Sequence, residues 1–309
     1  MSEQTLRNAR VLITGASGFV GTHLSRCLLA EGAQVHSVER ERLGQMRALQ
    51  SLIEGVRPTH IFHLAGILGT APGGWAAQYE ANVAVTSTLL ETVLASRTDP
   101  WIMISSSSAV YGATTPAENP LHEDRPLRPL TPYGVSHVAR EMLALQFYLA
   151  HGLRTVRVRT FNLVGPGQPE TLLASALTRQ VASAEHEGVP AAIRVGNLFP
   201  KRDYTDVRDA VRAYVLLAAT AQGGGVYNVC SGRSMSVQTC LDVLTRLVSV
   251  PVQIAVDPAR VRTLEISDQV GDARGLRQAT GWEPKIPLAS SLHDMLAFWR
   301  SRLQVGSQV

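Results

Sequence analysis

Three glycines spaced three residues apart follow directly after an apolar run near the start of the chain. Residues 10–14 read Arg-Val-Leu-Ile-Thr, and Gly15-Ala-Ser-Gly18-Phe-Val-Gly21 then gives the pattern GxxGxxG. In a strand–turn–helix unit these glycines permit a tight turn and a close approach of the backbone to a ligand. The helix expected over residues 18–31 would offer free N–H groups and a positive dipole to a pyrophosphate. The residues that would line such a dinucleotide site are Gly15, Ser17, Gly18, Phe19 and Val20.

Short apolar segments and longer amphipathic ones alternate through the first half of the chain. The predicted strands are residues 34–38, 59–64, 101–105 and 154–158, and the predicted helices are residues 76–96 and 132–150. Strands and helices that alternate at this spacing form parallel βαβ units. We therefore predict an α/β fold, a Rossmann-type doubly wound parallel sheet followed by a smaller mixed α/β C-terminal substrate lobe.

The alternation becomes less regular after Gly165, where proline and glycine cluster. Helices are expected at about 207–220, 236–248 and 288–303, with short strands between them. We predict a dinucleotide-binding domain over 1–163, rejoined by about 203–232, and a second lobe made of 164–202 and 233–309. The segment between Arg40 and Arg57 is too short for a further strand of the sheet.

Composition excludes several classes of protein. No apolar run among the 309 residues reaches the roughly 18 that a membrane span needs, and the first ten residues lack the apolar core of a signal peptide. The net charge is +4, without a basic cluster paired with aromatic residues, so we expect neither a nucleic-acid nor a membrane partner. The cysteines Cys27, Cys230 and Cys240 are odd in number and lack metal-ligand spacing, which predicts a reduced cytoplasmic setting without a metal.

Two charged residues after the second predicted strand bear on the identity of the dinucleotide. Glu39 lies 18 residues beyond Gly21, where an acidic group can bind the adenosine ribose hydroxyls and favour NAD. Arg40 follows at once and could bind a 2′-phosphate, which would favour NADP. Both residues belong to an alternating charge run that also suits a solvated turn. The predicted cofactor is therefore NAD or NADP.

Several ordered motifs resemble the extended short-chain dehydrogenase/reductases, in the subgroup of nucleotide-sugar epimerases, dehydratases and reductases. They are TGASGFVG at 14–21, His63-Leu-Ala-Gly66, Asn82, the serine run before Val110-Tyr-Gly112, and Thr131-Pro-Tyr133-Gly-Val-Ser136. Motifs at 159–168, 202–209 and 227–232 are most similar to those of enzymes that act on GDP-4-keto-6-deoxymannose. By this resemblance the further cofactor contacts are Leu64, Ala65, Gly66, Asn82, Tyr133 and His137.

The resemblance implies that Tyr133 is the acid/base of a hydride-transfer reaction and that Ser107 hydrogen-bonds the substrate oxygen. A tyrosine with a pKa near 10 needs a nearby cation, and the family pattern YxxxK provides a lysine that also binds the nicotinamide ribose. Here the fourth residue after the tyrosine is His137, which stays on the same helical face. Imidazole would carry a charge only below about pH 6.5. Three interpretations remain open. The protein is an active enzyme in which His137 tunes the Tyr133 pKa differently, a weakened enzyme, or a non-catalytic relative that binds the ligands.

The two residues after Ser107 distinguish between reactions. Similar sugar 4,6-dehydratases carry Asp-Glu there, whereas this chain has Ser108-Ala109, which cannot act as an acid and a base. Dehydration is therefore not expected. We expect NAD(P)H-dependent reduction of the C4 keto group of a nucleotide-linked 4-keto-6-deoxyhexose, preferably a GDP-sugar. A 4-epimerase that holds NAD tightly is the alternative.

The second lobe should hold the sugar nucleotide. By resemblance its contacts are Ser108, Asn162, Asn197, Arg202, Arg262 and Glu265. Arginine suits the diphosphate because its planar fork of donors matches phosphate oxygens. Leu163 departs from the Phe-Asn-His pattern common in the GDP-deoxymannose enzymes.

A homodimer is expected. The helices predicted over 76–96 and 132–150 carry apolar residues beyond one face, among them Val83, Leu89, Leu90 and Val93. Members of the resembled family pair these two helices across a two-fold axis.

Overall fold

A six-stranded parallel sheet forms the centre of the computed structural model, which describes residues 6–69, 73–260 and 266–306. The strands lie in the order β2-β1-β3-β4-β5-β9. Their bounds are β1 (Arg10–Thr14), β2 (Gln34–Val38), β3 (His60–His63), β4 (Trp101–Ser107), β5 (Thr155–Thr160) and β9 (Val226–Val229). The order reverses between β1 and β3, which is the position where open α/β sheets bind ligands at the carboxyl ends of their strands. The predicted fold class is confirmed.

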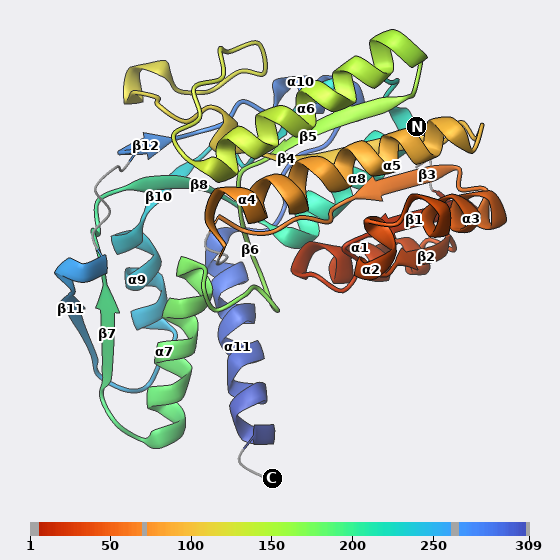
Figure 1. Cartoon of the computed structure of the whole chain (residues 1–309). Coiled ribbons are helices and arrows are strands. Elements are labelled where there is room, and N and C mark those ends of the chain that lie inside the picture. The colour runs from red at the N-terminus through yellow and green to blue at the C-terminus, as the bar shows by residue number, and fades with distance from the viewer. Residues whose placement is uncertain (1–5, 70–72, 261–265, 307–309) are drawn as a thin grey trace.

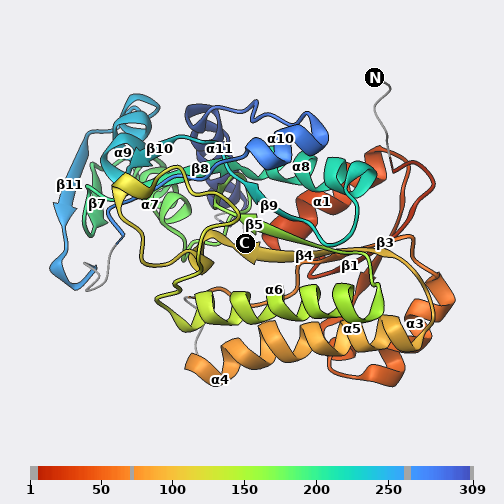
Figure 2. The same ribbon diagram turned by 90° about the horizontal axis from the view of Figure 1, so that it is seen from above.

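Helices cover both faces of this sheet, as Figure 2 shows. One face carries α1 (Phe19–Ala30), α8 (Val207–Thr220) and α10 (Arg274–Thr280). The other carries α3 (Met46–Val56), α5 (Val85–Ala95) and α6 (Pro132–His151). Each layer has its own apolar core, because strands buried on both faces supply aliphatic side chains to both. None of the helices that the structure describes is long and apolar enough to cross a membrane.

Three helices differ from the sequence-based expectations, and one short segment agrees with them. The helix expected over 76–96 consists of α4 (Gly74–Gln78), a π-helical segment (Tyr79–Ala84) and α5. Residues 40–56 form α2 (Arg40–Leu43) and α3, so β2 is the edge strand, and the prediction that no further strand fits there is confirmed. The helices α7 (Leu173–Glu187) and α10 were not predicted, because polar or small residues interrupt their apolar faces.

The C-terminal lobe is built around α7, α9 (Val237–Arg246) and α11 (Leu288–Gly306), which share one apolar core (Figure 1). A small sheet contains β6 (Asn162–Val164), β8 (Lys201–Asp206), β10 (Ser234–Ser236) and β12 (Asp268–Gln269). A parallel pair contains β7 (Ala191–Val195) and β11 (Val252–Val256). Within the segment expected to rejoin the first domain, β9 belongs to the large sheet, whereas β8 belongs to the small one. The domain boundaries expected from the sequence stay a prediction.

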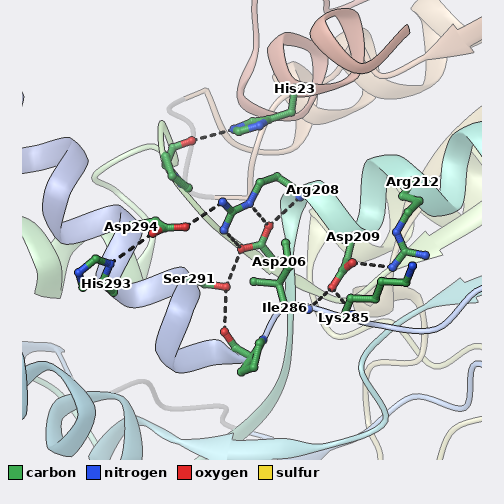
Figure 3. A network of polar contacts seen from close by, with 12 residues as sticks. His23, Asp206, Arg208, Asp209, Arg212, Lys285, Ile286, Ser291, His293 and Asp294 are labelled. Atoms are coloured by element: carbon green, nitrogen blue, oxygen red, sulfur yellow. Dashed lines mark hydrogen bonds and ion pairs between the residues drawn. The ribbon is translucent and has the colours of Figure 1, made fainter. Parts of the chain in front are cut away.

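A polar network at the N-terminus of α8 connects this lobe to the large sheet (Figure 3). Asp206 caps α8 by accepting from the Arg208 backbone N–H at 2.8 Å, and it also pairs with the Arg208 guanidinium. From α11, Ser291 donates to Asp206 at 2.6 Å and Asp294 pairs with Arg208 at 2.8 Å. His23 of α1 contacts the Pro166 carbonyl oxygen at 2.8 Å. These contacts fix the two lobes against each other beside the end of the sheet.

Candidate active site

The glycine loop between β1 and α1 has no room for side chains. Gly15 has a φ of +76°, and a Cβ atom there would lie 2.9 Å from the backbone nitrogen of Ala65. A Cβ atom on Gly21 would lie 2.1 Å from the Gly15 carbonyl oxygen. Gly18 is the N-cap of α1. Because glycine has no side chain to cap the helix, it leaves the first N–H groups of α1 uncovered. This cradle fits the pyrophosphate of a dinucleotide.

We expect Gly21→Ala to weaken dinucleotide binding by about 100-fold or more, because the added methyl group would push the Gly15 carbonyl into the cradle. Titration of NADPH or NADH fluorescence measures the change. Gly55→Ala in α3 is the matched control, since nothing lies within 4 Å of a Cβ atom there. It should leave binding unchanged and stabilise the helix by about 0.5–1 kcal/mol. Equal binding by the Gly21→Ala protein would contradict the assignment of this loop.

A buried histidine at the end of β3 orders the loop that follows. The Thr86 hydroxyl donates to the Asn82 carbonyl oxygen at 2.6 Å, so it accepts from His63 Nε2 at 2.9 Å. The Thr14 hydroxyl accepts from the Ala65 N–H and therefore donates to His63 Nδ1 at 2.7 Å. Each ring nitrogen thus has one role, and His63 is neutral. Burial and the neighbouring Arg140 charge hold its pKa well below the usual value.

Asn82 lies in the π-helical segment and is buried. Its Oδ1 accepts from the Ile67 N–H at 3.0 Å, and its Nδ2 donates to Gln78 and Ser136, each at 3.0 Å. A Cβ atom on Gly66 would lie 2.6 Å from this Oδ1, so glycine is required there. Asn82 therefore connects the predicted cofactor loop at 64–66 to α6. Because the Asn82 amide is hydrogen-bonded within the protein, Asn82 positions the loop after β3 in this structure.

Tyr133 and Ser107 come together where α6 begins and β4 ends. Thr131 caps α6 by accepting from the Gly134 N–H at 3.1 Å, with Pro132 as the first helical residue. The Ser107 oxygen accepts from the Ala109 N–H at 3.2 Å, which leaves its hydroxyl proton for the hydrogen bond with the Tyr133 oxygen. Burial raises the pKa of Tyr133, and the Ser107 bond and the Arg140 charge oppose that rise. The pair expected from the sequence is therefore assembled.

His137 lies directly beside Tyr133, with the two rings edge to face and their centroids 4.4 Å apart. It is buried, and burial followed by the Arg140 charge holds its pKa well below the usual value. One ring nitrogen donates to the Ser105 carbonyl oxygen, while the buried Nδ1 has no partner among the described residues. The expectation that this imidazole gains its charge near pH 6.5 is therefore wrong, because burial keeps it neutral at that pH. The unpaired Nδ1 can accept a hydrogen bond from a ribose hydroxyl.

Stability should fall with acid because His63 and His137 are buried in the neutral form. Their pKa values are lowered in the folded protein, so the unfolded chain binds more protons below about pH 6.5 and stability is lost as pH falls. From pH 7 to 5.5 the two groups should lower the free energy of unfolding by about 2–3 kcal/mol. Urea denaturation at both pH values tests this. His137→Gln should reduce the change in the free energy of unfolding between pH 7 and 5.5 by about 1 kcal/mol. If the variant showed the same change as the wild type, His137 would be charged in the folded protein.

Sequence reasoning missed Arg140, which is 1% exposed in the same site. Its Nη2 donates to the His63 carbonyl oxygen at 3.3 Å, and its Nε has no partner among the described residues. Burial lowers the pKa of Arg140 to about 10, against the opposing effect of Tyr133. The signal was present, because Arg140 follows Tyr133 by seven residues and so lies two turns along the same helical face.

A second missed group lies behind the site. Glu141 accepts from Arg159 Nε at 3.0 and 3.1 Å and from Arg159 Nη2 at 2.8 Å. It also accepts from the Ser106 hydroxyl at 2.5 Å. Arg159 also donates to the Tyr111 hydroxyl at 3.1 Å, and that hydroxyl donates to Asn228 Oδ1 at 2.7 Å. This buried network joins α6 to β4, β5 and β9. It thereby fixes the orientation of the helix that carries Tyr133.

The residues expected to hold the sugar nucleotide are only partly brought together. Asn162 follows β5, whose Thr160 pairs with Ser107, and it donates from Nδ2 to the Asp203 carbonyl oxygen at 3.4 Å. Arg202 lies on the neighbouring β8 and donates from Nη1 to the Ile266 carbonyl oxygen at 2.7 Å. The remaining positions are Ser108, which is buried in a 3-10 turn beyond β4, and Asn197, which follows β7 and accepts from the Phe199 N–H at 3.1 Å. Arg262 and Glu265 lie outside the described residues.

At the other end of the site, Glu39 and Arg40 follow β2 and are exposed. The Glu39 carboxylate is 3.1 Å from the Arg42 guanidinium. Both alternatives for the dinucleotide therefore remain available at this edge of the sheet. The glycine cradle and the unpaired Nδ1 of His137 fit a nicotinamide dinucleotide laid across the reversal between β1 and β3.

A doubly wound sheet with this glycine cradle, and with a serine and a tyrosine at its carboxyl edge, is the arrangement of a dinucleotide-binding protein. The chain belongs to the NAD dependent epimerase/dehydratase family, whose model matches residues 11–230. Members of this family are NAD(P)-dependent enzymes that act on nucleotide sugars.

Individual relatives match over nearly the whole chain. It is similar to a GDP-6-deoxy-D-mannose reductase of Pseudomonas aeruginosa, with 33% identity over 96% of this chain and 98% of the relative. A UDP-glucose 4-epimerase of Azospirillum brasilense is 30% identical over 98% and 95% of the two chains. The solved structure of RMD from Pseudomonas aeruginosa complexed with NADPH is 33% identical, covers 95% of this chain and 99% of its own, and superposes with a TM-score of 0.88.

Proposed function

We propose that this protein reduces the C4 keto group of a nucleotide-linked 4-keto-6-deoxyhexose, preferably GDP-linked, with NADH or NADPH. The observation that carries the proposal is the contact between Ser107 and Tyr133, next to Ser108 and Ala109. The site thus has one proton donor for a carbonyl oxygen, and it lacks the acid and base that removal of water would need at those two positions. The name of the 33% identical Pseudomonas relative supports the same choice.

The proposed mechanism divides proton donation, orientation of the carbonyl and binding of the two ligands among different residues. The bound dinucleotide supplies the hydride. Tyr133 donates its phenolic proton to the oxygen that becomes the C4 hydroxyl. When the substrate binds, the Ser107 hydroxyl turns from Tyr133 to the same carbonyl oxygen and orients it with its one hydrogen bond. The loops at 15–20 and 64–66 would hold the dinucleotide, and His137 Nδ1 would accept a hydrogen bond from its ribose. The residues proposed to bind the sugar nucleotide are Asn162, Asn197, Arg202, Arg262 and Glu265, with Ser108 beside the sugar.

Turnover of GDP-4-keto-6-deoxymannose with each dinucleotide tests the proposal. Loss of absorbance at 340 nm, stoichiometric with a new GDP-6-deoxyhexose, is the expected result. A 4-epimerase would instead interconvert a UDP- or GDP-hexose without net use of cofactor, and it would retain nicotinamide through gel filtration. Absence of turnover with every 4-keto sugar nucleotide, together with binding of both ligands, would contradict the reductase proposal and favour a non-catalytic relative.

We further propose a homodimer formed by the layer of α5 and α6. Leu89, Leu90 and Val93, which suggested this surface in the sequence, are buried in the protein's own core, because they face the sheet and α3. The exposed apolar residues of the layer are Leu94, Met142 and Leu149, with Leu149 71% exposed. Light scattering at micromolar concentration should therefore give the mass of two chains.

A charge on that layer should separate the two chains. Met142→Glu is expected to give a monomer, because Met142 and Leu149 lie seven residues apart on the same face of α6. Leu29→Glu places the same charge at a 58% exposed position on α1 and serves as the control. A wild-type protein with the mass of a single chain would exclude the dimer.

A further inference from the structure

The guanidinium of Arg140 is a buried cation without an anionic partner in the part of the chain that the structure describes. Its side chain is 1% exposed, and no carboxylate among the described residues lies within ion-pair distance of it. The adjacent Glu141 is directed to Arg159 and Ser106 and is fully used there. A buried charge costs free energy unless something compensates it. The groups that Arg140 faces therefore have to account for this buried charge.

The neighbours of Arg140 described here carry no negative charge of their own. From β3 come the His63 carbonyl oxygen, at 3.3 Å from Nη2, and the neutral His63 ring. In the loop beyond β3, a Cβ atom added to Gly66 would lie 3.1 Å from Arg140 Nη1, so the Gly66 backbone lies against the guanidinium. From α6 itself come His137, which is neutral, and Tyr133. Tyr133 is the one group of this set that gains negative charge during the proposed reaction.

The geometry of α6 directs the guanidinium toward Tyr133. Long side chains on a helix point back toward its N-terminus, and residues seven apart lie on one face two turns from each other. The extended arginine side chain covers part of that separation. His137 stands between the two residues and is in edge-to-face contact with the Tyr133 ring. Its imidazole fills the intervening space without adding charge.

We propose that Arg140 supplies the fixed positive charge that stabilises the phenolate of Tyr133, so that position 137 needs no cation. This inference rests on the proposed function in taking Tyr133 as the proton donor. Arg140 is a positioning residue that acts electrostatically through Tyr133, and His137 serves as a neutral contact for the tyrosine ring and the ribose. Because burial lowers the pKa of Arg140 only to about 10, its charge persists throughout the neutral range, whereas an imidazole charge would disappear above about pH 6.5.

The experiment measures the pKa of Tyr133 directly, without turnover. The absorbance change of phenolate formation is recorded against pH for the full-length protein, and the curve of the matching Tyr133→Phe protein is subtracted. Four backgrounds are compared: wild type, Arg140→Met, Arg140→Lys and the double variant His137→Lys/Arg140→Met. Arg157→Met is the control, because Arg157 is also buried but donates to the Gly224 carbonyl oxygen and lies near Glu141.

Arg140→Met should raise the pKa of Tyr133 by about one pH unit or more, the usual effect of removing an opposite charge nearby. Arg140→Lys should leave it close to the wild-type value, and the double variant should restore it by returning the charge through position 137. Arg140→Met should also be at least as resistant to urea as the wild type, because methionine fills a similar volume without an unpaired charge. In the reductase assay it should lose about 10- to 100-fold in kcat at pH 7, with recovery in the double variant.

The proposal is overturned if Tyr133 titrates identically with and without Arg140, or if Arg140→Met fails to fold and the double variant does not restore folding. Either result would make Arg140 a structural residue. A raised pKa with restoration, but no turnover in any background, would support the role of Arg140 and refute only the reductase activity.

Discussion

Replacement of Tyr133 by phenylalanine should lower kcat for the 4-keto sugar nucleotide by about 10²- to 10⁴-fold, the usual contribution of a general acid. Phenylalanine keeps the ring that packs against His137 at 4.4 Å and removes only the hydroxyl that Ser107 contacts. The fold and the dinucleotide affinity should therefore stay near those of the wild type. Steady-state kinetics and a fluorescence titration with NADPH measure the two quantities separately.

Tyr148→Phe is the matched control for this result. It removes a hydroxyl from the same helix at a half-exposed position, four turns from Tyr133, and should change kcat less than twofold. If Tyr133→Phe kept more than about a tenth of the wild-type kcat, another group would have to donate the proton. The assignment of Tyr133 as the acid would then be abandoned.

Arg159→Met should lower the free energy of unfolding by about 3–5 kcal/mol, the usual effect of removing one partner of a buried ion pair. The side chains of Arg159 and Glu141 are 4% and 0% exposed. Methionine would leave the Glu141 carboxylate buried with the Ser106 hydroxyl as its remaining hydrogen-bond donor among the contacts described above. Urea denaturation followed by circular dichroism measures the loss.

Arg277→Ala provides the comparison for an exposed pair. Arg277 lies 3.2 Å from Glu283, and the two side chains are 53% and 64% exposed. Solvent screens such a pair, so this variant should lose less than about 1 kcal/mol. Similar losses in the two variants would mean that the Arg159–Glu141 pair is not more strongly coupled than a surface contact.

The parts of the fold with strong periodicity could be predicted from the sequence. The first strand, the glycine turn and α1 follow from residues 10–31, and the bounds of α8 were predicted to the residue. The pairing of Ser107 with Tyr133 was implied by the resemblance of their motifs to those of the short-chain dehydrogenase/reductases. These features depend on local patterns and on the rule that parallel strands bring their carboxyl ends to one edge.

Other features depend on contacts that a linear pattern does not contain. The protonation of His137 is set by burial, and burial at one position of an amphipathic helix depends on what packs against it. Arg140 and Arg159 are both arginines near acidic or polar residues in the sequence. Arg159 pairs with the Glu141 carboxylate, whereas Arg140 has no carboxylate partner among the residues that the structure describes. The helix α7 was missed because its buried face contains small and hydroxyl residues such as Ser175 and Thr178.

The connection of α8 to α11 has a mechanical consequence. Asp206 caps one helix while it accepts from Ser291 of the other, and Arg208 spans from this cap to Asp294. A hinge rotation that separated α8 from α11 would have to break the Ser291–Asp206 and Asp294–Arg208 contacts together. We therefore expect the sheet and the C-terminal lobe to move as one rigid unit. In the proposed reaction, exchange of sugar nucleotide for product would then depend on rearrangement of the loops around Ser107 and Tyr133, and the rate of those loop motions would set an upper limit on turnover.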